Sequence, residues 1–314
     1  MNGTKNSCLF QAAQCLSPAV YRVIEPHFFE FENTAQEIRL RVCRPLSLVC
    51  RGKPLFFTLS GNVTDLPCGD LFTVSRAALE DTFQRMCDYS VYARQDEIVN
   101  GFVTLRGGHR AGVSGTAVCA DGKISNVRGI SSVNIRVARE YRGCAAGICK
   151  IVKSTHGGVL LCGEPCSGKT TMLRDLARLL SNEGTQSVAL IDERGELAAC
   201  VNGEPQNDVG LCDVYDGYPK AEAIRQAVRS MAPQLILCDE IGGSEDAAAV
   251  AQCQNCGVRV IATAHAGSME ELRRRKPLQA ILDSGAFSVF VFLKGHEQAG
   301  QTAYVVSEGV SDAA

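Results

Sequence analysis

The sequence contains no tryptophan, and aromatic residues make up only 6% of its 314 residues. Its net charge is −2, so neither sign of charge dominates. Proteins that hold single-stranded nucleic acid combine a basic groove with aromatic side chains on which the bases stack. The composition therefore argues against nucleic acid as the main partner, and the net charge provides no overall attraction to an anionic lipid surface.

Long apolar runs are also missing. No stretch approaches the roughly 18 consecutive apolar residues of a membrane span, and residues 1–5 lead into no signal-peptide core. Sixteen cysteines are scattered without framework spacing, which predicts reduced thiols in a soluble, cytoplasmic protein. Cys253 and Cys256 form a CxxC pair. We interpret them as part of a helix end, because no second pair completes a zinc site.

The composition that remains is that of a globular protein, with 46% hydrophobic and 21% charged residues. A chain of this length predicts two domains. The pattern changes near residue 150, from strands and helices mixed without order to a regular alternation of the two. We therefore predict a smaller α+β N-terminal domain over residues 1–145 and a parallel-rich α/β domain over residues 146–314.

Hydrophobic periodicity predicts the elements of the first half. Ser75 has the character of a helix N-cap. The expected elements are a helix over 17–29, strands over 36–44 and 46–50, a helix after Ser75, and extended runs over 101–105, 111–119 and 130–140.

In the second half, strands and helices alternate as a parallel sheet requires. A capping box at Ser268 and Glu271 predicts a further helix start. The expected strands are 158–162, 187–191, 235–238 and 258–263, the helices are 169–181, 220–232 and 245–255, and a terminal hairpin joins 287–293 to 302–307.

The strongest motif is G-x-x-x-x-G-K-[ST], which follows an apolar strand and opens a helix. In such a P-loop, backbone N–H groups converge on phosphate oxygens at a helix N-terminus. Lys169 would reach the β- and γ-phosphates, and the Thr170 hydroxyl would ligate Mg²⁺. The sequence therefore predicts a site for ATP and Mg²⁺, although no base-reading motif excludes GTP. The predicted nucleotide contacts are Gly163, Glu164, Pro165, Cys166, Ser167, Gly168, Lys169, Thr170 and Thr171.

A second acidic feature supports hydrolysis. The apolar strand 235–238 ends in Asp239 and Glu240, which is a Walker B arrangement. We expect this strand to lie beside the P-loop strand, so that Asp239 holds Mg²⁺ and Glu240 polarises the attacking water. The alternative is that these carboxylates only cap a neighbouring helix.

Two further strand ends carry polar side chains. Charged residues over 192–196, including Glu193, follow the second strand, and Thr263 and His265 follow the fourth. Ligands bind at this edge of a parallel sheet, so Glu193 and His265 are candidate catalytic residues. A solvated loop and a structural histidine are the alternatives that the sequence leaves open.

Together these strand ends resemble the secretion-ATPase branch of the RecA-like P-loop NTPases. The segments 37–41, 107–112, 132–140, 191–194 and 239–242 are very similar to the stage III sporulation protein AA family, over about residues 15–310. The family's second histidine-bearing stretch is not evident here. The resemblance implies a RecA-like fold for the second domain.

For function, the resemblance implies an ATP hydrolase in the mother-cell cytoplasm of an endospore-forming bacterium. The family is expected to act as a homo-oligomeric ring, with a hexamer as one candidate. It would energise membrane-embedded sporulation channel proteins, and so be recruited peripherally to the forespore-facing membrane. In such a ring an arginine of the neighbouring subunit offsets charge on the transferred phosphoryl group, for which Arg136 and Arg139 are candidates and Arg110 an outside one. Exposed arginines on a strand are the ordinary alternative.

Two other functions remain open at this point. RecA-like cores also serve nucleic-acid-dependent ATPases, which would respond to RNA or single-stranded DNA, although the composition makes nucleic acid an unfavoured partner. A nucleotide-gated scaffold would instead bind ATP and scarcely hydrolyse it.

Overall fold

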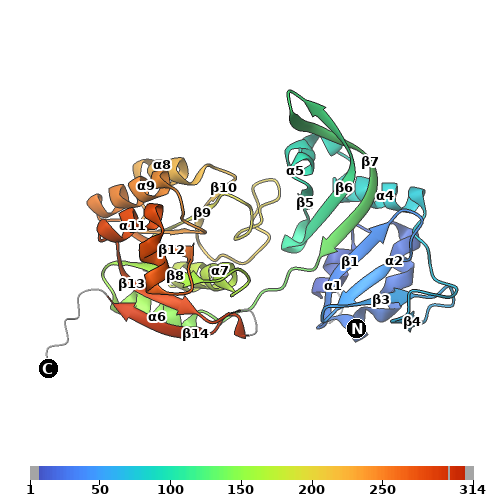
Figure 1. The fold of residues 1–314 in the computed structure, drawn as a ribbon, viewed down its shortest axis with the longest axis horizontal. Helices are drawn as coiled ribbons and strands as arrows, with labels where there is room; N and C mark the ends of the chain where they lie inside the picture. The colour runs from blue at the N-terminus through green and yellow to red at the C-terminus, as the bar shows by residue number, and fades with distance from the viewer. Residues whose placement is uncertain (1–6, 296–297, 308–314) are drawn as a thin grey trace. The chain divides into compact units, whose positions relative to one another are not determined.

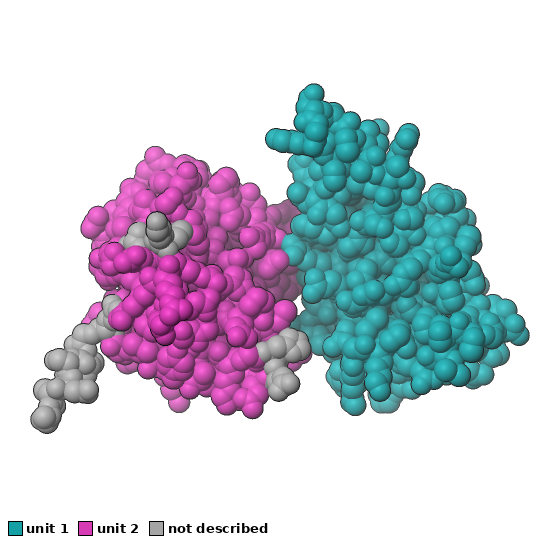
Figure 2. Space-filling model, viewed as in Figure 1, with its two compact units in different colours: residues 1–139 teal, residues 140–314 magenta. Residues whose placement is uncertain are grey.

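The computed structural model describes residues 7–295 and 298–307. The chain divides into two compact units, residues 1–139 and 140–314, which are coloured separately in Figure 2. The sequence pattern placed this division at 145/146. The difference arises because the intervening segment packs on the second unit, where the Ala145 N–H donates to Asp175 Oδ2 at 2.9 Å. The outer ends of the two predicted domains, residues 1 and 314, lie outside the described residues.

Unit 1 is built on a seven-stranded antiparallel sheet (Figure 1). Its alternating pattern decides which face is covered: in the strand Ala35–Arg41, Ile38 and Leu40 are fully buried while Glu37 and Arg39 are not. In sheet order the strands are β4 (Val63–Thr64), β3 (Lys53–Phe57), β2 (Ser47–Cys50), β1 (Ala35–Arg41), β7 (Lys123–Arg136), β6 (Arg110–Ala120) and β5 (Phe102–Thr104).

Helices supply the other half of the unit 1 core. Ser75 accepts the N–H of Ala78, so the predicted N-cap is confirmed. The predicted helix over 17–29 is divided into α2, a 3-10 turn and α3. The helical elements are α1 (Cys8–Ala13), α2 (Pro18–Ile24), η2 (Glu25–His27), α3 (Phe28–Phe31), α4 (Arg76–Met86), η3 (Val91–Arg94), α5 (Gln95–Val99) and η4 (Arg106–Gly108).

The hairpin β6–β7 is longer than the sequence predicted. The strand expected over 130–140 begins at Lys123, because Asp121 and Gly122 turn with φ of 50° and 74° and join the two strands directly. Two adjacent positive φ values are the geometry of a type I′ hairpin turn.

Unit 2 contains a second seven-stranded sheet, parallel except for the last strand. Helices cover both faces, as in a doubly wound fold, with α6 and α7 on one face and α8 to α11 on the other. In sheet order the strands are β10 (Asp213–Asp216), β9 (Val188–Asp192), β11 (Leu235–Cys238), β12 (Arg259–His265), β8 (Gly158–Gly163), β13 (Phe287–Leu293) and β14 (Thr302–Ser307). The helices are α6 (Ala146–Ser154), α7 (Lys169–Asn182), α8 (Lys220–Ser230), α9 (Ser244–Asn255), α10 (Met269–Arg274) and α11 (Lys276–Asp283).

One sequence expectation about this sheet is wrong. The Walker B strand β11 does not lie beside the P-loop strand β8, because β12 is inserted between them. Because α7 connects β8 to β9, which lies beyond both β12 and β11, it crosses the sheet and packs against all four strands. Thr170 in its first turn donates to Asp239 after β11. The acidic pair after β11 therefore still meets the start of α7.

Other elements of unit 2 agree with the sequence. The predicted N-cap Ser268 accepts the N–H of Glu271 at 3.2 Å, and β13 and β14 form the predicted terminal hairpin. The short edge strand β10 and the helices α6 and α11 were not predicted. Among the described residues, no helix is long and apolar enough to cross a bilayer.

His109, just before β6, holds the segment that follows β7 in unit 1. Its side chain is fully buried, and Nδ1 accepts the N–H of Ala138 at 2.9 Å. Burial, assisted by the neighbouring Arg139 charge, lowers the pKa of His109 from 6.5 to about 4. The folded protein therefore holds this imidazole neutral over a range in which the unfolded chain protonates it.

This lowered pKa predicts acid sensitivity of unit 1. Because the unfolded state binds more protons below pH 6.5, the free energy of unfolding should fall by about 3 kcal/mol as pH drops from 6.5 to about 4. His109→Asn keeps an acceptor for Ala138 and should remove most of this loss. Urea unfolding across this pH range measures the effect, with the exposed His156→Asn as control. Equal pH dependence in wild type and His109→Asn would contradict it.

Candidate functional site

The P-loop curls between β8 and α7. Lys169 folds back over it, and its ammonium donates to the Gly163 carbonyl at 2.9 Å and to the Glu164 carbonyl at 2.7 Å. The curl requires glycine at its start, since a Cβ on Gly163 would lie 2.5 Å from Ser167 Oγ. Gly168 has φ +90°, a conformation that other residues rarely adopt.

The chemistry of this loop fits a phosphate group. Ser167 is fully buried, and its Oγ has no hydrogen-bond partner among the described residues. The N-terminal turn of α7 begins at the same point and provides unpaired N–H groups. Burial lowers the pKa of the Lys169 ammonium, while Asp239 and Glu240 oppose this shift. A buried cation and a helix N-terminus together form a site that an anion would stabilise.

The two predicted Mg²⁺ ligands are in contact. Thr170 Oγ1 donates to Asp239 Oδ2 at 2.9 Å. A hydroxyl and a carboxylate are hard oxygen donors, and Mg²⁺ usually takes one or two protein ligands and keeps several waters. The pair therefore fits Mg²⁺, which needs few protein ligands. The described residues contain no cluster of three or more acidic, cysteine or histidine side chains that could hold a metal ion.

Thr263, in the middle strand β12, organises the acidic pair. Its hydroxyl donates to the other Asp239 oxygen, Oδ1, and accepts the Glu240 N–H at 2.7 Å. Thr263 is fully buried, so these bonds are shielded from water. The sequence pattern had named Thr263 only as part of a polar strand end, because its central role depends on β12 lying between β8 and β11.

Glu240 is held in an unusual backbone conformation. Its φ is +44°, which is costly for a residue with a side chain. The strain is offset by hydrogen bonds on both sides: the N–H is bound by Thr263 and Asp239, and the carbonyl accepts from Lys220 Nζ at 2.7 Å. This conformation directs the carboxylate toward Arg194 Nη1, 2.6 Å away, and His265 Nε2, 3.4 Å away.

His265 joins the P-loop to the acidic pair. Its Nδ1 lies 3.2 Å from Lys169 Nζ. Since an ammonium can only donate, Nδ1 is the acceptor and the proton is on Nε2, which faces Glu240 Oε1. A change at the P-loop lysine can therefore reach Glu240 through one imidazole.

Glu193 contacts Lys220 at the start of α8, and its catalytic role stays a prediction. One oxygen accepts the Lys220 N–H at 3.2 Å at the start of α8, and the other lies 3.3 Å from Lys220 Nζ. Lys220 is thus a buried cation between Glu193 and the Glu240 carbonyl, and sequence analysis missed it. Little in the sequence marks Lys220, because a lysine that follows a proline at the start of a helix belongs to no recognised motif.

Asp192, the first residue of the acidic segment, fixes the loop that follows β9. Asp192 is buried, and its carboxylate accepts the N–H groups of residues 196–199. Arg174 of α7 donates to the carbonyls of Glu196 and Leu197 at 2.6 and 2.9 Å. The loop after β9 is therefore tied to the P-loop helix as well as to its own strand.

The predicted arginines of unit 1 differ from each other. Arg139 Nη2 donates to the carbonyls of Glu32 and Ala35 at 2.6 and 2.8 Å, within its own unit. Arg136 lies exposed at the end of β7, and no ion pair or hydrogen bond of its side chain is found among the described residues. Arg110, its cross-strand neighbour, stacks on Phe102 at 4.2 Å.

Thr263→Val should destabilise the arrangement of Asp239 and Glu240. It removes a buried hydroxyl that serves both Asp239 and Glu240, which should cost about 2–3 kcal/mol in the free energy of unfolding. Thr263→Ser keeps the hydroxyl and removes one buried methyl, which should cost about 1 kcal/mol. Urea unfolding of the two variants measures the difference. If Val costs no more than Ser, the hydroxyl does not hold the site together.

Known proteins are similar to this chain along most of its length. The family model described as "Sporulation stage III, protein AA" matches residues 9–310. Stage III sporulation protein AA from Bacillus subtilis (strain 168) is 34% identical over 287 residues, covering 89% of this chain and 88% of the relative. Protein SEEDLING PLASTID DEVELOPMENT 1 of Arabidopsis thaliana is 30% identical over 157 residues, or 49% of this chain and 22% of the plant protein.

Solved structures show the same fold at low identity. The ATPase DotB from Legionella pneumophila has a TM-score of 0.55 at 17% identity and covers 88% of this chain and 76% of its own. The pilus retraction motor PilT, solved with bound ADP, has a TM-score of 0.56 at 16% identity, covering 86% and 76%. The expected fold, a parallel-rich α/β domain preceded by a smaller α+β N-terminal domain, is confirmed. By sequence, the chain belongs to the sporulation stage III protein AA family.

Proposed function

We propose that this protein is a Mg²⁺-dependent ATPase that works as an oligomer and energises a secretion-like assembly during endospore formation. One observation carries the proposal: the P-loop lysine, a histidine and the Walker B glutamate form a continuous chain of contacts beside the Thr170–Asp239 pair. DotB and PilT, which share the fold, are described as an ATPase and a retraction motor. The partners would be membrane-embedded channel proteins, and the protein would act from the mother-cell cytoplasm.

Phosphate binding would use the P-loop as described. Lys169 would exchange its bonds to the Gly163 and Glu164 carbonyls for phosphate oxygens, which reward its charge more strongly. Thr170 and Asp239 would hold Mg²⁺, which offsets charge on the phosphates. The contact between Lys169 and His265 would then change. Because His265 also contacts Glu240, this change would transmit the presence of the γ-phosphate to Glu240.

Hydrolysis requires Glu240 to face a water molecule. Its Oε2 is paired with Arg194 at 2.6 Å, so this arginine competes with water for the carboxylate. Arg194 is 65% exposed, which weakens the pair by solvent screening. We infer that release of Arg194 is part of activation. Lys220 and Thr263 would keep the backbone of Glu240 in place meanwhile.

Assembly into a ring would bring an arginine of one subunit to the nucleotide of its neighbour, where its positive charge would offset the charge on the transferred phosphoryl group. Arg136 is exposed and unpaired among the described residues, whereas Arg139 already serves two carbonyls of its own unit. Arg136 is therefore the better supported candidate for acting on the nucleotide of a neighbouring subunit. A hexamer is the ring size that we propose.

Nucleotide hydrolysis measured against protein concentration tests this function. Turnover per subunit should rise with concentration, require Mg²⁺, and be lost in Lys169→Ala because the phosphate cradle loses its buried cation. RNA and single-stranded DNA should leave it unchanged. Strong stimulation by either nucleic acid would instead make the protein a nucleic-acid-dependent ATPase. Binding of ATP without turnover at any concentration would make it a nucleotide-gated scaffold.

Arg194→Ala should increase turnover. Removing a screened ion pair worth about 1 kcal/mol would free Glu240 and raise the rate at low protein concentration about fivefold. Arg229→Ala, which removes an exposed arginine paired with Glu222 on α8, is the matched control and should change little. Turnover of Arg194→Ala at or below that of wild type would contradict a restraining role.

A further inference from the structure

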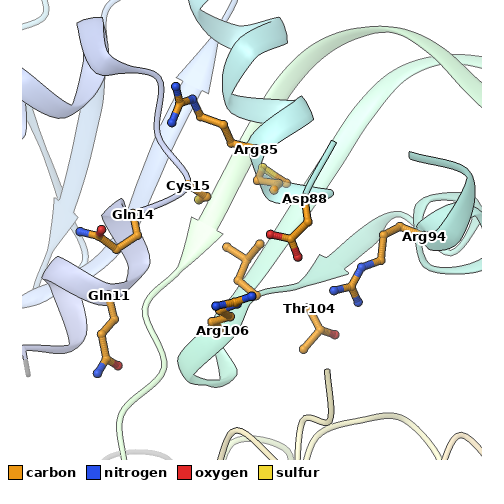
Figure 3. A pocket seen from close by; sticks show the side chains of 10 residues that line it. Gln11, Gln14, Cys15, Arg85, Asp88, Arg94, Thr104 and Arg106 are labelled. Carbon is orange, nitrogen blue, oxygen red and sulfur yellow. The ribbon is translucent and has the colours of Figure 1, made fainter. Parts of the chain in front are cut away.

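A polar cavity lies within unit 1, apart from the nucleotide site of unit 2. It has a volume of about 270 Å³ and opens between α1, the end of α4 and the turn η4 (Figure 3). Such a volume is somewhat below the roughly 300–1,000 Å³ of pockets that hold drug-sized ligands. The lining residues are Gln11, Gln14, Cys15, Arg85, Met86, Asp88, Arg94, Thr104, Leu105 and Arg106.

Two of the three lining arginines are oriented by carboxylates outside the cavity. Arg85 Nε pairs with Asp81 at 3.1 Å, and Arg94 Nη1 pairs with Glu97 at 2.8 Å. Glu97 is itself fixed, because its second oxygen accepts the Thr104 N–H at 2.6 Å. Each guanidinium has five N–H donors, so these pairings position Arg85 and Arg94 without using up their capacity to bind an anion.

Arg106 is the third arginine, and it begins the Arg106–Arg110 motif that the nucleotide site does not use. Its side chain makes no ion pair or hydrogen bond with any described residue. In Figure 3, Asp88 and Thr104 lie between Arg94 and Arg106. Two guanidinium groups therefore approach the same small space from different elements.

The glycine of the motif explains why α1 can line this cavity. Gly107 has φ +78°, and a Cβ there would lie 2.8 Å from Gln11 Oε1. Glycine thus allows Gln11 to pack directly against the turn that carries Arg106. A larger residue would force the Gln11 side chain to shift and would be strained at this φ, so the Arg-Gly-Gly sequence has a specific structural use here.

The lining indicates the kind of ligand. In Figure 3, Arg94 and Arg106 lie on either side of one acidic side chain, Asp88, whereas the guanidinium of Arg85 points away from it. Two carboxamides and a threonine are further hydrogen-bonding groups of the lining. Guanidinium groups bind phosphate through paired N–H···O bonds, because their planar array of donors matches the spacing and the negative charge of the phosphate oxygens. We propose that this cavity binds the phosphate group of a small molecule, independently of the P-loop in unit 2.

Inorganic phosphate is the probe, titrated calorimetrically at constant ionic strength into the full chain carrying Lys169→Ala, in which the P-loop lysine is absent. Adding Arg106→Gln should weaken phosphate binding about tenfold, the value of one charge-assisted hydrogen bond. Arg106 has no described partner, so this variant should fold normally, which circular dichroism checks. Arg76→Gln, an equal charge change on the exposed face of α4, should alter affinity by no more than about twofold.

Succinate distinguishes phosphate from a carboxylate ligand and should bind about tenfold more weakly. The proposal is overturned if the Lys169→Ala protein binds no phosphate, if Arg106→Gln and Arg76→Gln weaken binding equally, or if succinate binds as tightly as phosphate. Since the P-loop is the same in both arginine variants, a failure here leaves the proposed ATPase function unaffected.

Discussion

The hydroxyl of Thr263 is the point on which the site depends. It binds the carboxylate of Asp239 and the backbone N–H of Glu240 at once, from a strand that separates the P-loop strand from the Walker B strand. It is one of the contacts that hold Glu240 at φ +44°. Strain of this kind persists only where surrounding contacts over-determine the backbone, and here Lys220 provides the second contact through the Glu240 carbonyl.

Around this point, the charged side chains of the site have partners within the protein. Lys169 is satisfied by two carbonyls and His265, Glu240 by Arg194 and His265, and Glu193 by Lys220. A triphosphate and its metal would compete for several of these partners simultaneously. In the proposed function, nucleotide would be coupled to motion by the exchange of these internal contacts for stronger ones to the phosphates and metal.

Much of this could be predicted from the sequence, because the signals were local. The P-loop, the Asp239–Glu240 pair and the N-caps Ser75 and Ser268 depend on residues within a few positions of one another. The order of strands could not be predicted in the same way, since an apolar strand has no mark that identifies its neighbour. The central role of Thr263 and the contribution of Lys220 were missed for the same reason: their partners are 20 or more positions away. The cavity of unit 1 likewise brings together α1, α4 and η4, which are distant in sequence.

The most direct test of the account is a comparison of nucleotide binding and hydrolysis in Glu240→Gln. This change keeps the size of the side chain but removes the charge that would polarise water. The account predicts that Mg·ATP still binds with an affinity close to that of wild type, while turnover of assembled protein falls by about 100-fold or more. Turnover equal to that of wild type would show that Glu240 is not the catalytic residue.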